Sequence, residues 1–116
     1  MSQRHTPDSL SESSFNQAVD DTLDAIETAL DDMGSDLDYG NSGGVLTLRC
    51  DNGSQIILSR QTPVRQLWVA TRTGGFHFER SLNNEWLLEG SDQNLGTFIA
   101  EALRLQDEEA PEFGTL

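Results

Sequence analysis

The sequence predicts an α+β fold, a two-layer α/β sandwich in which an N-terminal and a C-terminal helix pack on one face of a five- to six-stranded antiparallel sheet. Apolar residues recur at helical spacing near both ends of the chain, and short alternating segments bounded by turn residues fill the middle. Each of these elements has one apolar face. The simplest way to bury these faces lays both helices on the same side of the sheet and leaves the other side open.

The first helix is predicted from a single apolar stripe. Its members follow one another at spacings of 4, 4, 3, 4 and 3 residues: Phe15, Val19, Leu23, Ile26, Leu30 and Met33. The helix is expected to begin near residues 11–14, where serines can cap it, and to stop at Gly34. The pattern indicates an amphipathic helix of about 20 residues.

Turn residues divide the middle of the chain into a meander of strands. Asn-Gly at 52–53 lies between two β-rich segments and predicts a tight hairpin, and Thr-Gly-Gly at 73–75 predicts the next turn. A sixth strand follows if the short segment after Gly34 is extended. Helical spacing returns at residues 95–103. The five strands predicted from composition and turns are residues 45–50, 55–60, 66–71, 76–80 and 85–88.

The charge of the chain excludes several classes of function. It has 20 acidic residues against 7 arginines and no lysine, which gives a net charge of −13. Nucleic acids and anionic membranes are not expected as partners, because both are bound through basic surfaces. The missing lysine also excludes phosphate-loop and Schiff-base chemistry. With Cys50 as its single cysteine, the chain alone cannot form a disulfide, a four-cysteine zinc site or a cysteine-ligated iron–sulfur cluster.

The length suits a single domain over residues 1–116, with an ordered core at about 11–106. The acidic, proline-containing end at 107–116 is expected to be a loose, solvated tail. The chain shows no signal peptide, transit peptide or apolar run of membrane-spanning length. We therefore expect a soluble cytosolic protein, in a reducing compartment that suits the single cysteine.

The acids are unevenly distributed. Residues 5–48 contain ten acids and no lysine or arginine, whereas residues 49–80 contain five arginines and two acids. Eight acids of the first block are predicted to form a continuous acidic ridge. Since a helix turns by about 100° per residue, four of these acids fall on a narrow stripe at the edge of the first helix, and two fall further toward solvent. The last two can share one face of the segment after Gly34 if it is extended. In that order they are Asp20, Asp24, Glu27 and Asp31; Asp21 and Asp32; and Asp36 and Asp38.

Folding does not explain this ridge, since like charges four residues apart destabilise a helix by about 0.2–0.5 kcal/mol per pair. Three interpretations remain open from the residues alone: a solvated face, a cation site, or a docking surface for a basic partner. Carboxylates are hard oxygen ligands for Ca²⁺, Mg²⁺, Mn²⁺ or iron. A convex helix edge without a neighbouring histidine cannot enclose an ion, so such a site would be exposed, weak and unselective. Docking needs no enclosure, because long-range attraction steers a basic surface to the ridge.

Other side chains offer fewer candidates. His77 lies in a strand pattern and Cys50 ends a strand, where structural roles are favoured, and no catalytic triad can be assigned. Trp68 differs, because its two neighbours along the strand take the opposite face. It is expected on the open face of the sheet near Arg60 and Gln61. An exposed tryptophan beside arginine is typical of a binding hot spot.

These residues resemble the bacterial, CyaY-type frataxins. The resemblance runs from about Phe15 to Leu105 and is most specific in four stretches: 43–48 (GGVLTL), 52–54 (NGS), 60–71 (RQTPVRQLWVAT) and 74–78 (GGFHF). It implies the sandwich already inferred and an acidic ridge that binds iron weakly and docks on the cysteine desulfurase of iron–sulfur cluster assembly. It also implies a second contact surface on the open sheet face, for the cluster scaffold protein. The chain departs from the family pattern at Glu27-Thr28, where paired acids are common, and at Ser59, where many frataxins have asparagine.

The resemblance implies a monomeric, non-enzymatic accessory protein of the bacterial cytoplasm that binds Fe²⁺ or Fe³⁺, with other divalent cations competing. Whether it donates iron or regulates the desulfurase in response to iron stays open, as do iron-induced oligomers. The alternative is a metal-independent acidic interaction module that mimics a polyanion. The implied metal ligands are Asp20, Asp24, Glu27, Asp31, Asp32, Asp36 and Asp38. The residues expected to contact partners are Asp21, Asp31, Asp32, Arg60, Gln61 and Trp68.

Overall fold

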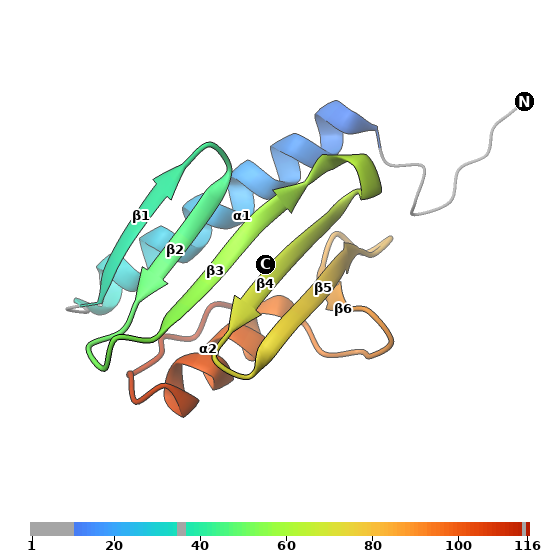
Figure 1. The fold of residues 1–116 in the computed structure, drawn as a ribbon. Coiled ribbons are helices and arrows are strands. Elements are labelled where there is room, and N and C mark those ends of the chain that lie inside the picture. The colour runs from blue at the N-terminus through green and yellow to red at the C-terminus, as the bar shows by residue number, and fades with distance from the viewer. Residues whose placement is uncertain (1–10, 35–36, 115) are drawn as a thin grey trace, which may run out of the picture.

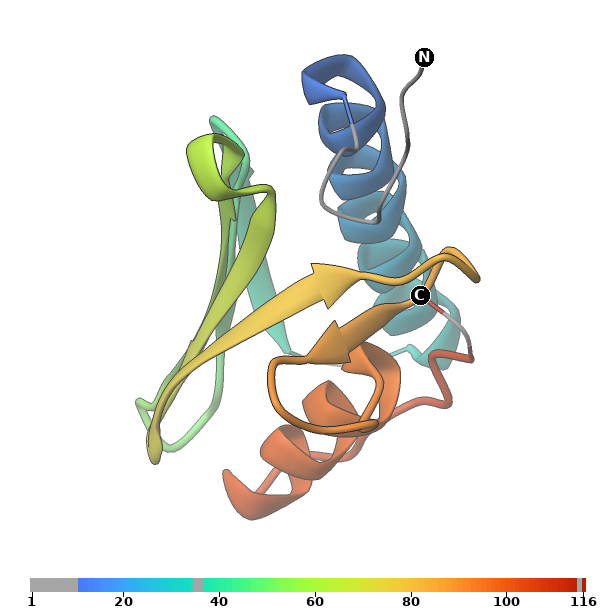
Figure 2. The same ribbon diagram turned by 90° about the vertical axis from the view of Figure 1, so that its right-hand side faces the viewer.

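The predicted two-layer architecture is confirmed in the computed structural model, which describes residues 11–34, 37–114 and 116. Two helices, α1 (Glu12–Met33) and α2 (Leu95–Leu105), pack on one face of a six-stranded antiparallel sheet. Figure 1 looks onto the other face of the sheet, with α1 running behind it, and the turned view in Figure 2 separates the two layers. Neither helix in the described ranges combines the length and the apolar character that a membrane crossing requires.

The strands lie side by side in chain order, as a meander. Their bounds are β1 Asp38–Ser42, β2 Val45–Arg49, β3 Gln55–Gln61, β4 Gln66–Thr71, β5 Gly74–Arg80 and β6 Trp86–Leu88. The segment after Gly34 does supply the sixth strand, because β1 pairs with β2 at one edge of the sheet. A short 3-10 helix, η2 (Thr62–Val64), joins β3 to β4. The turn predicted at 73–75 is shorter than expected, since its two glycines already pair with residues 70–71 of β4.

The helix α1 begins and ends at the residues that the sequence indicates. The hydroxyl of Ser11 accepts a hydrogen bond from the amide of Ser14 at 3.1 Å, and Gly34 closes the helix in the left-handed conformation, with φ at 71°. The apolar stripe from Phe15 to Leu30 is buried in the core. Because this stripe is fixed against the sheet, the acidic edge of α1 lies at the boundary between the sheet and solvent.

Trp86 connects α1 to β6, the strand at the edge of the sheet opposite to β1. Its side chain is fully buried, and its indole Nε1 donates a hydrogen bond to the hydroxyl of Thr22 on α1 at 2.8 Å. Its ring also meets Phe15 edge to face, with centroids 6.0 Å apart. These contacts join residues far apart in the chain, and they help to fix the orientation of the helix that carries the acids.

The C-terminal segment contacts the core at several of its described residues, whereas the sequence predicted a loose, solvated tail over 107–116. Leu116 is only 7% exposed, and its carbonyl accepts a hydrogen bond from the amide of Trp86 at 3.2 Å. Phe113 packs on the core as well. Gly96 of α2 permits this approach, because a Cβ there would lie 2.6 Å from the carbonyl oxygen of Gly114. Two apolar residues within an acidic stretch therefore connect the segment to the core.

Candidate functional site

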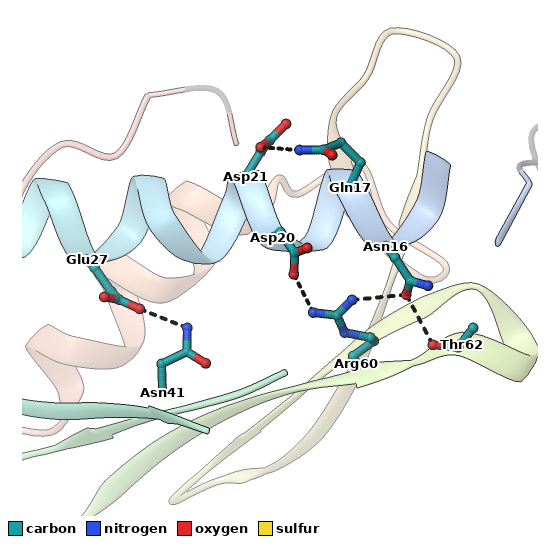
Figure 3. A network of polar contacts seen from close by, with 8 residues as sticks. All are labelled: Asn16, Gln17, Asp20, Asp21, Glu27, Asn41, Arg60 and Thr62. Carbon is teal, nitrogen blue, oxygen red and sulfur yellow. Dashed lines mark hydrogen bonds and ion pairs between the residues drawn. The ribbon is translucent and has the colours of Figure 1, made fainter. Parts of the chain in front are cut away.

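The acidic edge of α1 faces the ends of β1 and β3, and side chains from both strands reach it (Figure 3). Asp20, Asp24 and Asp31 are exposed, and Glu27 is half-buried against β1. Asp21 lies further round the helix, where it accepts a hydrogen bond from Gln17 at 2.8 Å. The predicted stripe is therefore present on α1, and its two halves have different partners.

An arginine on the helix side of the sheet binds the N-terminal half of the acidic edge of α1. Arg60 of β3 pairs in register with Leu67 of β4, so its side chain points to the helix side of the sheet. Its Nη2 forms an ion pair with Asp20, and its Nη1 donates a hydrogen bond to Asn16 Oδ1 at 3.0 Å. The hydroxyl of Thr62 donates to the same oxygen at 3.3 Å (Figure 3). This network neutralises the charge of Asp20.

Neutral donors from β1 hold the C-terminal half. The hydroxyl of Tyr39 donates a hydrogen bond to Asp31 Oδ1 at 2.7 Å, and the amide of Asn41 donates to Glu27 Oε2 at 2.9 Å. The hydrogen bond to Asp31 raises the pKa of Tyr39, and desolvation and the charges of Asp31 and Glu27 raise it further. Tyr39 and Asn41 orient the two carboxylates and leave their negative charge uncompensated.

Asp24 and Asp32 complete this half of the edge. Both are exposed, and neither makes a hydrogen bond or an ion pair to another residue that the structure describes. No positive side chain of the described residues lies beside either of them, and together with Glu27 and Asp31 they form a run of four acids on α1.

Asp38 does not continue the ridge in the way that the sequence suggested. It pairs in register with Arg49 of β2 on the open face of the sheet, opposite to the side that Tyr39 takes, and its carboxylate lies 3.4 Å from the Arg49 guanidinium. Asp36 lies outside the described residues. The physical reason is the alternation of β1, which sends Tyr39 toward α1 and its neighbour Asp38 away from it.

The donor set suits iron chemically, since carboxylate oxygens are hard ligands for Fe²⁺ and Fe³⁺. Among the described residues, however, no group of three histidine, cysteine, aspartate or glutamate side chains is placed to hold one ion together. The edge therefore offers single carboxylates and loose pairs rather than a closed coordination sphere.

A second polar network surrounds Trp68 on the open face. The indole is 36% exposed and stacks on the ring of His77, with centroids 4.3 Å apart and planes 11° from parallel. Its Nε1 donates to the side-chain oxygen of Gln66 at 2.8 Å. The amide nitrogen of Gln66 donates in turn to Glu79 at 3.2 Å and to Glu89 at 3.3 Å. Sequence reasoning predicted the exposure of Trp68 but missed this network.

Arg60 is not part of the surface around Trp68, which corrects the expected grouping of these residues. Gln61 pairs in register with Gln66 and shares the face of Trp68, whereas Arg60 points to α1. The alternation of β3 carried the necessary signal, since Arg60 is in phase with the buried Ile56 and Leu58.

The remaining candidates have structural surroundings. Cys50 is buried beside the amide of Gln106, whose nitrogen lies 3.5 Å from the sulfur. Arg80 lies over the ring of Trp86, 5.2 Å from its centroid, and burial lowers the pKa of Arg80 while the charge of Asp21 opposes that shift. The charge of Asp21 therefore favours the protonated form of this half-buried arginine.

The chain matches the family model of the frataxin-like domain over residues 8–109. The iron-sulfur cluster assembly protein CyaY of Stutzerimonas stutzeri is 48% identical over 109 residues, which cover 93% of this chain and 99% of that protein. The CyaY protein of Pseudomonas aeruginosa is 47% identical over 105 residues, covering 90% of this chain and 97% of the other. The chain belongs to the frataxin-like family, and the resemblance noted from its sequence is confirmed.

Solved structures agree with this assignment. Frataxin from Psychromonas ingrahamii is 33% identical and superposes with a TM-score of 0.83, covering 89% of this chain and 97% of that one. The trimeric frataxin from the yeast Saccharomyces cerevisiae, solved in complex with ferrous iron, is 23% identical with a TM-score of 0.64, covering 91% of this chain and 89% of the other. The second likeness supports the fold alone.

Proposed function

We propose that the protein acts in iron–sulfur cluster assembly, in the bacterial cytoplasm, as an iron-binding accessory protein without catalytic activity of its own. Relatives 47% and 48% identical, over 90% and 93% of the chain, carry the name iron-sulfur cluster assembly protein. The observation that carries the proposal is the row of exposed carboxylates on α1 whose charge is not neutralised between Asp24 and Asp32.

Iron binds this row weakly, as a cargo or a regulatory ligand. The carboxylates are exposed and no third ligand converges on the ion with them, so water readily replaces them in its coordination sphere. Other divalent cations compete for the same oxygens. The ligands in this proposal are Asp24, Glu27, Asp31 and Asp32, and Asp36 from the following segment is a proposed outer member. Asp20 and Asp38 are not included, because their carboxylates pair with Arg60 and Arg49.

The same edge docks on a basic surface of the cysteine desulfurase through Asp21, Asp31 and Asp32, by long-range attraction. The open face with Trp68 and Gln61 contacts the scaffold protein. An exposed aromatic ring held by a fixed polar network has the composition of a binding hot spot. The protein acts as a monomer in this proposal, and it binds neither nucleic acid nor membrane.

A titration with Fe²⁺ in the absence of oxygen, followed by NMR, tests the iron site. We expect resonance broadening centred on residues 24–32 of the wild type and its loss in the fourfold variant D24N/E27Q/D31N/D32N. The matched control neutralises four acids away from the edge: Asp51, Asp92, Glu109 and Glu112. Equal iron binding by the edge variant and the wild type would contradict the proposal.

The alternative function, a metal-independent polyanion mimic, predicts a different result. Salt-sensitive docking would then persist while no cation produces a localised effect on α1. Addition of Ca²⁺ in the same titration distinguishes a general cation effect from one that depends on iron.

A further inference from the structure

We infer that Arg60 determines where a cation binds on the α1 edge: it holds Asp20 as an internal counter-ion and confines binding to the stretch from Asp24 to Asp32. The inference rests on the proposed iron-binding function and assigns a selecting residue to that site. It concerns a residue that the sequence had placed on the opposite face of the sheet.

The guanidinium is held at two points on successive turns of α1. Nη2 pairs with the carboxylate of Asp20 while Nη1 donates to Asn16, four residues earlier on the same side of the helix. Only 22% of the Arg60 side chain is exposed, against 56% of the Asp20 side chain. A partly buried arginine with two fixed acceptors is a stronger internal partner than a freely solvated one.

The turn between β1 and β2 lies against the head group of Arg60. Gly44 lies so close that a Cβ on it would be 2.6 Å from Arg60 Nε, and its carbonyl accepts a hydrogen bond from the Arg60 amide at 3.2 Å. The guanidinium therefore lies between this turn and α1, beside the Asp20 carboxylate. A cation that binds Asp20 must displace a positive charge that is already in place.

The C-terminal half presents no such obstacle. Tyr39 and Asn41 are uncharged, each donates one hydrogen bond, and the second oxygen of Asp31 and of Glu27 is left for a cation. Asp24 and Asp32 have no hydrogen-bond or ion-pair partner within the described ranges. A cation is therefore attracted to the segment from Asp24 to Asp32 and repelled near Arg60.

Arg49 supplies a matched control for this inference. It pairs with Asp38 at 3.4 Å on the open face, where the two side chains are 47% and 74% exposed. Its replacement by glutamine changes the net charge of the protein by the same amount as R60Q and leaves the α1 edge untouched.

The test follows Ca²⁺, a diamagnetic probe, through the side-chain carboxyl carbon shifts measured by NMR in the wild type, R60Q and R49Q. In the wild type we expect shifts of the carboxyl carbons of residues 24–32 at Ca²⁺ concentrations that leave the Asp20 carboxyl carbon unmoved. In R60Q we expect Asp20 to shift as well and the apparent affinity to rise roughly two- to fivefold. R49Q should leave Asp20 unmoved, which separates a local effect from a change in net charge.

The double variant R60Q/D20N tests the same point without leaving an unpaired charge, should R60Q alone be unstable. Its affinity is expected within about twofold of the wild type, whereas D24N should lose more. A Ca²⁺-dependent shift of the Asp20 carboxyl carbon in the wild type, or its absence in folded R60Q, would overturn the inference while the proposed iron site stands. No Ca²⁺ shift of any α1 carboxyl carbon in the wild type would also overturn the inference, and no Fe²⁺ broadening on α1 would overturn the proposed iron site with it.

Discussion

The acidic edge of α1 and the open face around Trp68 are both rich in carboxylates, but the carboxylates of the two surfaces have different hydrogen-bond and ion-pair partners. On the edge, β1 supplies neutral donors that orient Glu27 and Asp31 without cancelling their charge. On the open face, Glu79 and Glu89 share the amide of Gln66, and Glu89 also lies 3.6 Å from the imidazole of His77.

Under the proposed function, this difference separates two kinds of recognition. A row of uncompensated charges acts at long range and is weakened by salt, whereas a stacked aromatic pair in a closed polar network acts only on contact. The five arginines of residues 49–80 do not form a basic patch that would blur this division. Arg49, Arg60, Arg65 and Arg72 bind a carboxylate or a backbone carbonyl of the same chain, and Arg80 lies over Trp86.

The largest effect is expected from charge reversal on the edge. In D31K/D32K, affinity for the cysteine desulfurase should fall roughly ten- to a hundredfold at low salt, because four units of charge change on an exposed docking surface. High salt should weaken the wild-type complex and reduce this difference. Calorimetry at two salt concentrations measures both effects. The control E109K/E112K makes the same change of charge on the C-terminal segment, and an equal loss there would contradict a specific role for the edge.

Removal of the aromatic ring should act only when the scaffold protein is present. W68A is expected to leave binding to the desulfurase alone unchanged and to weaken binding to the desulfurase–scaffold complex roughly five- to thirtyfold, since an exposed aromatic anchor is lost. The same calorimetric titration, with and without scaffold, measures this difference. L82A removes a more exposed apolar side chain outside the network and should have no effect. A loss of affinity for the desulfurase alone in W68A would remove the division between the two surfaces.

The two regions should also differ in how neutralisation affects folding. Asp24 has like charges three and four residues away on α1, so D24N is expected to raise the free energy of unfolding of the metal-free protein by about 0.5–1 kcal/mol. E89Q removes the charge that faces His77 and should lower it by about 0.2–1 kcal/mol. Urea unfolding with D92N as the control measures both. If E89Q instead raised the free energy of unfolding, the carboxylates of the open face would repel one another as those of the edge do.

Much of this arrangement can be predicted from periodicity. The capped helix, its buried stripe and the exposure of Trp68 follow from spacings within single elements, where side-chain direction is set by the local backbone. The placement of Arg60 was within reach of the same rule, because Leu58, two residues earlier, is buried on the helix side. Proximity to Trp68 in the neighbouring strand suggested the wrong face.

The remaining features depend on contacts between distant segments. The hydrogen bond between Tyr39 and Asp31 exists only because β1 runs along α1, and no spacing within either element encodes it. The burial of the C-terminal segment also depends on distant contacts, since Phe113 and Leu116 alone do not define a helical or strand period that would predict their burial. Such contacts depend on how the elements pack together, and they decide which acids lie beside a positive side chain.

The smallest effect concerns Tyr39, the only tyrosine in the chain, whose ultraviolet absorbance therefore reports one group. Its pKa lies above the ordinary value of 10.0, because the protonated hydroxyl donates to the negative Asp31. We expect D31N to lower this pKa toward the ordinary value. D32N removes a neighbouring charge without touching the hydroxyl and should shift it less.

The sign of the coupling to stability follows from the direction of the shift. A pKa raised in the folded state means that the hydrogen bond stabilises the protein below the ordinary tyrosine pKa, and that this contribution is lost as the pH rises through the raised value. The stability difference between wild type and Y39F should therefore be present at neutral pH and disappear in alkali. Absorbance titration of folded wild type, D31N and D32N measures the pKa, and urea unfolding across the same pH range measures the stability. Identical titration midpoints in all three proteins would show that Asp31 does not raise the pKa of Tyr39. The acidic edge would then resemble the open face, where the carboxylates have partners within the protein.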